Sequence, residues 1–270
     1  MAPIQEVFVS ARETKSPISN LPVHMPGQSL RAKRDALFDD KMAPYLIVAA
    51  LLLFLTVMEW YACWQRLPRM PWLYTAMALV AIVVACVKFR SAVREGKDLR
   101  LGLLGEEAVG QFLDEKMRPL DCQVLHDIPG ENFNIDHVVI GPTGIFAIET
   151  KTHSKPAKGA CNVVYDGAKV TVNGYSPNRD PIVQARAQAS WLSSTIQEST
   201  GRRLFVKPIV VYPGWYVTSH PETDDVWVLN ANPVPTFIMN NRRSMSPEDV
   251  SLVTFHLKRY VISQDKAKQG

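Results

Sequence analysis

Two long apolar runs with a short connection between them occupy the first third of the 270-residue chain. The first run, residues 45–64, contains one acid, Glu59, and the second run, residues 71–87, contains no charged residue. Each approaches the roughly 20 residues that a helix needs to cross the hydrocarbon core of a bilayer. We therefore predict a two-helix transmembrane hairpin over residues 42–90; the alternative is a pair of buried helices in a soluble fold.

The orientation of this hairpin follows from its aromatic and basic residues. Aromatic residues gather where the two runs approach each other, as in an interfacial belt: Trp60, Tyr61, Trp64, Trp72 and Tyr74. Basic residues flank the outer ends: Arg31, Lys33, Arg34, Lys41, Lys88, Arg90, Arg94, Lys97 and Arg100. The only basic residues in the Gln65–Met70 connection are Arg66 and Arg69. Positive-inside counting predicts a multi-pass protein of the inner membrane with both termini in the cytoplasm.

The flanking segments differ in character from the hairpin. Residues 1–41 contain several prolines and no sustained periodicity, so we predict a mostly disordered cytoplasmic tail. Residues 91–270 hold 20 Lys and Arg against 20 Asp and Glu, so the net charge of +4 lies in the first 90 residues. The pI of 8.8 is therefore a weak argument for nucleic-acid binding. The four cysteines lack zinc-site spacing and are expected to be free thiols.

Residues 91–270 read as one α/β domain after a charged linker, Arg94 to Arg100. The pattern is helix, strands, helix, strands, helix. The first predicted helix, residues 105–117, places Glu106 on its buried stripe, three residues before Val109. A buried acid is costly unless it is paired or liganded, so Glu106 is a candidate site residue. The alternative is an acid that stabilises the positive end of a helix dipole.

The segment Asn134 to His153 reads as a β-hairpin with a Gly-Pro-Thr-Gly turn. Pairing Ile140 with Ile145 places Asp136 opposite Glu149, and strand alternation puts Lys151 on the same face as Glu149. Two facing carboxylates repel each other, so this arrangement calls for a divalent cation such as Mg²⁺. Lys151 would position or deprotonate a water molecule. A solvated polar face with a Glu–Lys pair is the alternative.

A second helix is predicted to begin after Asp180, with Pro181 at its first position. Its buried stripe is Ile182, Ala185, Ala189, Leu192 and Ile196. Gln184, in the first turn, is either a phosphate contact or a solvent-exposed side chain. Strands at residues 204–212 and 226–229 and a closing helix at residues 247–261, capped by Ser246, complete the domain.

Four motifs together resemble a known family, the nuclease-related domain called NERD, over roughly residues 103–191. They are residues 102–106 (GLLGE), residues 134–139 (NIDHVV), residues 149–151 (ETK) and residues 181–184 (PIVQ). The resemblance implies the PD-(D/E)-x-K nuclease superfamily and a restriction-endonuclease-like fold, a mixed central sheet flanked by helices.

The same resemblance implies a role for five residues. It implies Asp136 and Glu149 as metal ligands and Lys151 as the water-positioning base or stabiliser. It implies Glu106 as an accessory acid near the metal and Gln184 as a contact for substrate or for Lys151. His137 and His153 match nothing in the family pattern and stay unassigned.

The expected function is therefore a membrane-anchored nuclease that uses Mg²⁺ or Mn²⁺ to hydrolyse DNA, with RNA as the second choice, on the cytoplasmic side. Its expected partners are nucleic acid and the lipid bilayer. The alternatives are a non-catalytic nucleic-acid or partner-binding module and a structural membrane subunit.

Overall fold

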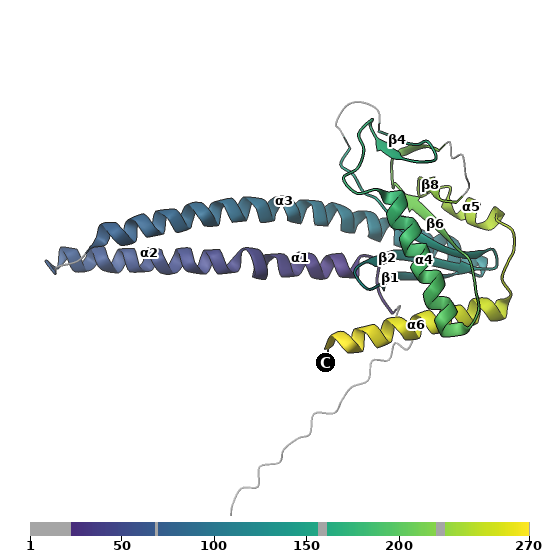
Figure 1. The fold of residues 1–270 in the computed structure, drawn as a ribbon. Coiled ribbons are helices and arrows are strands. Elements are labelled where there is room, and N and C mark those ends of the chain that lie inside the picture. Colours follow the sequence, from purple (N-terminus) through teal and green to yellow (C-terminus); the bar gives the residue numbers. More distant parts are fainter. Residues whose placement is uncertain (1–22, 68–69, 156–160, 220–224, 270) are drawn as a thin grey trace, which may run out of the picture.

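The structure is a computed structural model, and it describes residues 23–67, 70–155, 161–219 and 225–269. A long helical hairpin projects from a mixed α/β domain (Figure 1). The prediction of a mixed sheet flanked by helices and preceded by a helical hairpin is confirmed at this level.

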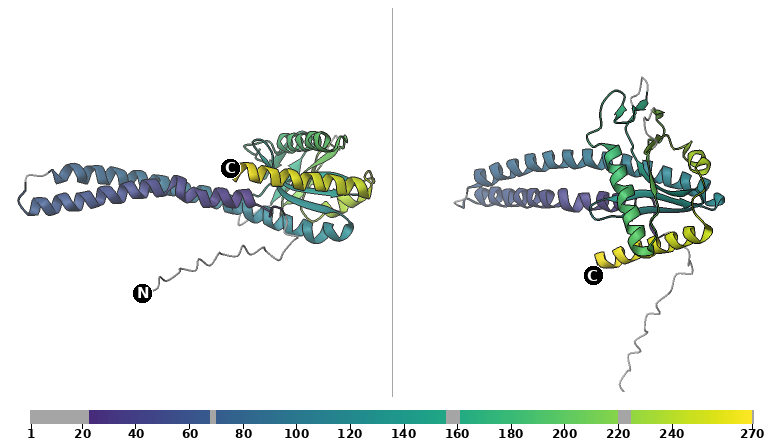
Figure 2. Two further views of the ribbon diagram at one scale, coloured as in Figure 1. Left: turned by 90° about the horizontal axis from the view of Figure 1, so that it is seen from below. Right: turned by 45° about the vertical axis from the view of Figure 1, so that its right-hand side comes forward.

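The projecting part consists of α1 (Gln28–Lys41), α2 (Ala43–Trp64) and α3 (Pro71–Met117). Two further views show α1 and α2 lying one after the other along α3 (Figure 2). In its projecting half, α3 buries small residues at intervals of seven, namely Pro71, Ala78, Ala85 and Ala92. A seven-residue interval returns to nearly the same helix face, so these residues let the antiparallel helices approach closely.

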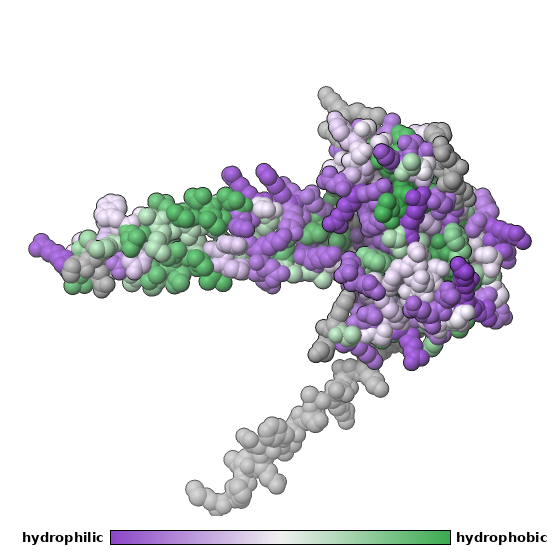
Figure 3. Space-filling model, in the orientation of Figure 1, coloured by the Kyte–Doolittle hydropathy of each residue, from purple (hydrophilic) through white to green (hydrophobic). Residues whose placement is uncertain are grey.

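The other side chains of the hairpin are largely apolar and exposed. Two helical stretches, residues 28–64 and 71–120, are long and apolar enough to cross a membrane by length and composition. In the first stretch, the most apolar window has no buried residues. In the second stretch, 11% of the corresponding window is buried. The apolar surface covers the end of the hairpin that is distant from the domain (Figure 3).

Two predictions about the segments next to the hairpin are wrong. Residues 28–41, expected to be disordered, form α1; the earlier part of the predicted tail, residues 1–22, lies outside the described residues. The predicted linker from Arg94 to Arg100 lies inside α3, which continues for 47 residues without interruption. The connection at residues 68–69 also lies outside the described residues.

Contacts between α1 and α3 explain why both segments are helical. Ion pairs join Arg31 to Glu107 at 2.5 Å and Lys41 to Glu95 at 2.5 Å. Leu37 of α1 lies against Gly96 of α3, where the missing side chain gives it room. In this packed pair, charged side chains that suggested a linker instead connect two helices.

The main sheet has the strand order β1-β2-β3-β6-β8. Its first three strands are antiparallel, and β6 and β8 run parallel to β3. The strands are β1 (Gln123–Pro129), β2 (Asn134–Gly141), β3 (Gly144–Thr150), β6 (Val206–Val211) and β8 (Trp227–Leu229). A second, smaller sheet joins β5 (Val170–Val172), β4 (Asn162–Tyr165) and β7 (Tyr216–Ser219).

Helices cover both faces of the main sheet. On one face, α4 (Pro181–Thr200) and α6 (Pro247–Gln269) pack against alternate residues of β2 and β3. On the other face lie the end of α3 and α5 (Val234–Asn240), and a 3₁₀ turn (Arg118–Leu120) follows α3. This two-sided cover explains why β3 is buried along its whole length.

The predicted helix starts are confirmed by their caps. The Asp180 carboxylate accepts a hydrogen bond from the Ile182 amide at 2.9 Å, and Pro181 begins α4. The Ser246 hydroxyl accepts one from the Asp249 amide at 3.1 Å at the start of α6. The predicted buried stripe of α4 is also confirmed. All four cysteines are free, as expected: Cys63, Cys86, Cys122 and Cys161.

Candidate active site

The β2–β3 hairpin has the predicted register. Ile140 pairs with Ile145, and Gly141 pairs with Gly144 across a two-residue turn. Gly144 has a φ of 133°, which a residue with a side chain rarely adopts. The ladder ends at the pair His137 and Ile148, and continuing its register by one residue would place Asp136 opposite Glu149.

Glu149 lies at the centre of a hydrogen-bonded network. Its side chain is almost fully buried, at 5% exposure. Lys151 Nζ lies 2.6 Å from Glu149 Oε1 and 2.8 Å from Gln184 Oε1. The Gln184 amide donates to Glu149 Oε1 at 2.7 Å, which closes a three-membered ring of contacts. Gln184 therefore contacts both the acid and the lysine that the sequence placed on one strand face.

Asp136 completes the carboxylate pair from the neighbouring strand. Its Oδ2 accepts a hydrogen bond of 2.7 Å from the backbone amide of Thr150. Burial raises the pKa of Asp136 well above its ordinary value, and the charges of Glu149 and Glu106 add to this effect. The Thr150 amide and the charge of Lys151 act in the opposite direction. Asp136 and Glu149 therefore repel each other when both are charged.

Glu106 reaches the same cluster from α3. Burial raises the pKa of Glu106 to about 8, and the charges of Asp127 and Glu149 contribute further. Lys151 and Lys33 oppose that increase. The charge of Glu106 therefore interacts with those of Asp136 and Glu149, although its carboxylate comes from a different element.

A close helix-to-strand approach positions α3 at the site. Gly105 lies against the side chain of Thr152, and any Cβ at position 105 would overlap Thr152 Oγ1 and crowd its Cβ. Thr152 directly follows Lys151 in the chain. The position of Glu106 relative to Lys151 therefore depends on a glycine one residue before that acid.

Two residues in this network were not predicted from sequence. The Gln188 side chain, 2% exposed as a residue, donates to Glu149 Oε2 at 2.6 Å and to the Asn134 carbonyl at 3.0 Å. The signal was available, because Gln188 follows Gln184 by one helical turn and shares its face. Asp127 had no such signal, because its partners come from distant parts of the chain.

Asp127 links His24 and Ser29, near the start of the described chain, to Asn134 of the β2–β3 hairpin. Its carboxylate accepts hydrogen bonds from the Asn134 side chain at 2.8 Å and from the Ser29 amide at 2.6 Å. Its backbone carbonyl contacts His24 Nδ1 at 2.7 Å. Asp127 has a φ of 50°, a left-handed conformation that Asp tolerates better than most residues. The site is therefore assembled partly by α1 and by the segment just before it.

The unassigned histidines have structural neighbours. His137 Nδ1 lies 3.0 Å from His126 Nδ1, and burial, followed by the charge of His126, lowers the pKa of His137 to about 3. The His153 ring stacks on Tyr212 at a centroid distance of 5.9 Å. Burial lowers the pKa of His153, and the charge of Lys151 lowers it further. Both rings are thus held neutral near neutral pH.

A hard cation such as Mg²⁺ is bound by oxygen donors, which the carboxylates of the site can supply. Among the described residues, no three His, Cys, Asp or Glu side chains are placed to hold a metal ion by themselves. Mg²⁺ does not need three, because one or two carboxylates and several waters suffice. Glu149 accepts hydrogen bonds from Lys151, Gln184 and Gln188, which leaves about one of its roughly four lone-pair positions. Asp136 and Glu149 therefore fit a partly hydrated Mg²⁺ or Mn²⁺.

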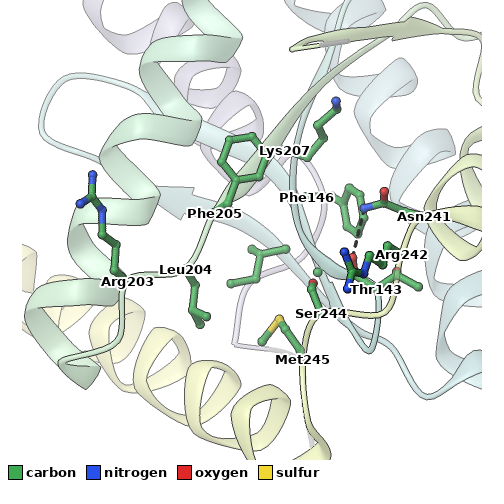
Figure 4. A pocket seen from close by; sticks show the side chains of 12 residues that line it. Thr143, Phe146, Arg203, Leu204, Phe205, Lys207, Asn241, Arg242, Ser244 and Met245 are labelled. Carbon is green, nitrogen blue, oxygen red and sulfur yellow. Dashed lines mark hydrogen bonds between the residues drawn. The ribbon is translucent and has the colours of Figure 1, made fainter.

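A cavity of about 320 Å³ lies at the opposite end of β3 (Figure 4). Its labelled lining comes from the segment around β6, the turn before β3, the start of β3 and the segment between α5 and α6: Thr143, Phe146, Arg203, Leu204, Phe205, Lys207, Asn241, Arg242, Ser244 and Met245. The carboxylate cluster is at the other end of the strand, so this cavity is separate from the candidate active site.

Comparisons with known proteins agree with the motif pattern. Residues 101–213 match a family model described as nuclease-related domain, NERD. This range extends from α3 to the end of β6 and includes all five predicted site residues. An uncharacterized protein of Bacillus anthracis is 31% identical over 77 residues, which cover 27% of this chain and 36% of that protein. The match thus spans about a third of that relative's length. No solved structure matches the chain significantly.

Proposed function

We propose that this chain is a membrane-anchored nuclease of the PD-(D/E)-x-K type that uses a divalent metal ion to hydrolyse phosphodiester bonds. DNA is the proposed substrate, with RNA as the second choice. The observation that supports this most directly is the close grouping of Asp136, Glu149 and Lys151, with Lys151 Nζ 2.6 Å from Glu149.

In this proposal Asp136 and Glu149 hold Mg²⁺ or Mn²⁺. When bound, such an ion polarises a phosphoryl oxygen and lowers the pKa of a coordinated water. The repulsion between the two carboxylates supports this role. A bound cation would relieve this repulsion, which helps to raise the pKa of Asp136. Hydrolysis of the phosphodiester bond would add a water oxygen to phosphorus and release the sugar oxygen, which takes up a proton.

The remaining residues act on the reacting groups directly or through their neighbours. Lys151 presents a cationic Nζ at the site and is suited to orient the attacking water and to balance phosphate charge. Gln184 and Gln188 keep Glu149 and Lys151 in place through hydrogen bonds of 2.6 to 2.8 Å. Glu106, with a pKa of about 8, is the proposed accessory acid, since it retains a proton at neutral pH.

Membrane anchoring is proposed from the exposed apolar surface of the hairpin and the placement of its charges. The apolar parts of α2 and α3 are exposed in the structure, which favours contact with lipid over a buried soluble core. The basic residues at the domain end of the hairpin favour a cytoplasmic domain and a multi-pass inner-membrane protein.

A non-catalytic binding module is the second candidate. Two observations favour it: the charge balance of residues 91–270, and the three hydrogen bonds that already occupy Glu149. Such a module would bind nucleic acid or a partner through the same fold without cutting.

Cleavage assays on the full-length protein in lipid nanodiscs separate the two candidates. We expect DNA cleavage with Mg²⁺ or Mn²⁺, none with EDTA, and none for Asp136→Asn, which keeps the shape of the side chain but removes its charge. Metal-dependent cleavage that persists in Asp136→Asn would indicate a contaminating nuclease. Absence of cleavage of DNA and RNA by the wild type would favour the binding module.

A further inference from the structure

Three basic residues form a stripe along the part of α3 between the apolar hairpin and the domain. They are Arg90, Arg94 and Lys97, and all three are exposed. Residues in an α-helix are about 100° apart, so Arg90 and Arg94 lie about 160° from Ala92, and Lys97 lies about 140° from it. Ala92 is buried at 1% exposure on the packed face of α3. This basic stripe therefore faces away from α1 and α2.

The basic stripe leads towards the candidate active site. Arg94 and Gly105 are eleven residues apart, so they lie within about 20° of the same line on the helix and about 16 Å apart along it. Gly105 is the residue that contacts Thr152, next to Lys151. Figure 3 shows a band of hydrophilic side chains where the hairpin approaches the domain.

The charges of the basic stripe are not neutralised by ion pairs. Within the described part of the chain, the ion pairs of this region join Arg31 to Glu107 and Lys41 to Glu95 on the α1 side of the helix. Arg90, Arg94 and Lys97 have no acidic partner within 4.0 Å among those residues. Asp98 is the exposed acid nearest to them in sequence. The stripe thus presents a net positive surface.

We propose that Arg94 and Lys97 of the basic stripe bind the phosphate backbone of nucleic acid and guide it to the candidate active site. The inference rests on the proposed function and assigns the substrate contact outside the nuclease-related domain itself. It also bears on a difficulty of that function: nucleic-acid backbones are normally bound by basic surfaces, and residues 91–270, although neutral overall, carry Arg94 and Lys97 together on this stripe.

Distance from the bilayer favours nucleic acid over anionic lipid as the partner. Arg90 follows the last residue of the apolar run, Val87, by three residues, or about 5 Å of helix. Arg94 and Lys97 lie about 10 and 15 Å beyond Val87 by the same rise. The headgroup layer is only about 5 to 8 Å deep on each side. Arg90 is therefore at headgroup height, and the other two residues extend beyond it.

The test is metal-free binding of a short fluorescent DNA duplex to the full-length protein in nanodiscs of phosphatidylcholine, with EDTA present. Arg94→Ala/Lys97→Ala is compared with the control Lys88→Ala/Arg90→Ala, which removes the same charge at headgroup height. We expect the slope of log affinity against log salt to become shallower by about 2 in the first variant and to change little in the control. Asp98→Asn should bind more tightly than the wild type.

Two results would overturn the proposal. Equal slopes in the wild type and Arg94→Ala/Lys97→Ala would overturn it, as would an equal loss in the control. Nanodiscs containing phosphatidylglycerol identify the lipid alternative: loss of the difference between the variants there would show that lipid occupies the stripe. Binding is measured without catalysis, so a wild type that binds through the stripe but never cuts would overturn the nuclease function and leave this inference standing.

Discussion

At the scale of single residues, Lys151 has a different relation to the site from the two acids. Its Nζ contacts Glu149 and Gln184, whereas Asp136 is held by a backbone amide. Removing the lysine therefore leaves both carboxylates available, with Glu149 still bound by two glutamine amides. The acids and the lysine should consequently separate metal binding from cleavage.

We predict that Lys151→Ala abolishes cleavage but retains metal binding, while Asp136→Ala loses both. Mg²⁺ or Mn²⁺ at about 100 times its Kd should stabilise the wild type by about 2.7 kcal/mol, since it binds only the folded state. Thermal unfolding with and without metal measures this stabilisation. Lys155→Ala, an exposed lysine four residues away, is the matched control and should behave as the wild type. Equal metal-induced stabilisation of Asp136→Ala would contradict the proposed ligand.

We predict that the metal-free protein loses stability as the pH rises from about 5 to 8. Folded Glu106 keeps its proton up to a pKa of about 8, whereas the unfolded chain releases it near 4.5. The folded state then binds more protons in this window, so the free energy of unfolding falls with rising pH. Melting temperatures in EDTA should show a flatter profile for Glu106→Gln. Identical profiles for the variant and the wild type would exclude Glu106 as the source of the pH dependence of stability.

The sequence predicted those contacts of the candidate site that local rules can place. A Gly-Pro-Thr-Gly turn sets the hairpin register, in which Ile140 pairs with Ile145, and this register brings the ladder to the residues next to Asp136 and Glu149. Gln184 followed from the position of a capped helix start. Asp127 was not predictable, because its contact with Ser29 joins positions 98 residues apart and no local pattern indicates it.

At the scale of elements, the sequence indicated the existence of helices and strands better than their continuity. Charged residues between Arg94 and Arg100 suggested a linker, but α1 supplies partners that stabilise a helix there. A signal was present in the small residues at intervals of seven, since Ala92 extends the pattern beyond the apolar run. Residues 28–41 contain mostly good helix formers, so a local signal for α1 was present, and the prolines before it led to the prediction of disorder.

We predict opposite effects for two glycine substitutions in α3. Gly96→Ala should stabilise the protein by about 0.5 to 1 kcal/mol, because alanine favours helix and its Cβ would meet Leu37 at an ordinary 3.5 Å. Gly105→Ala should destabilise it and reduce cleavage, because the new Cβ overlaps Thr152 beside Lys151. Denaturant unfolding and cleavage rates measure the two effects. A Gly105→Ala protein with wild-type stability and activity would refute the close approach of α3.

At the scale of the whole molecule, we predict a cytoplasmic domain and an external connection between α2 and α3. The reason is the excess of basic residues at the domain end of the hairpin. A topology reporter at the C-terminus should read cytoplasmic, and one inserted in the Gln65–Met70 connection should read external. Digestion of the domain by protease added outside intact spheroplasts would contradict this orientation.

The uninterrupted α3 helix has a consequence for how such a protein would find its substrate. Glu106 lies 19 residues beyond Val87, or about 28 Å along a helix that has no break in between. A site on a stiff stem moves with its membrane segment and sweeps a thin layer parallel to the bilayer. Under the proposed function, nucleic acid passing through that layer meets a high effective concentration of active sites. Nucleic acid deeper in the cell is out of reach, so location would limit cutting without any recognition of sequence.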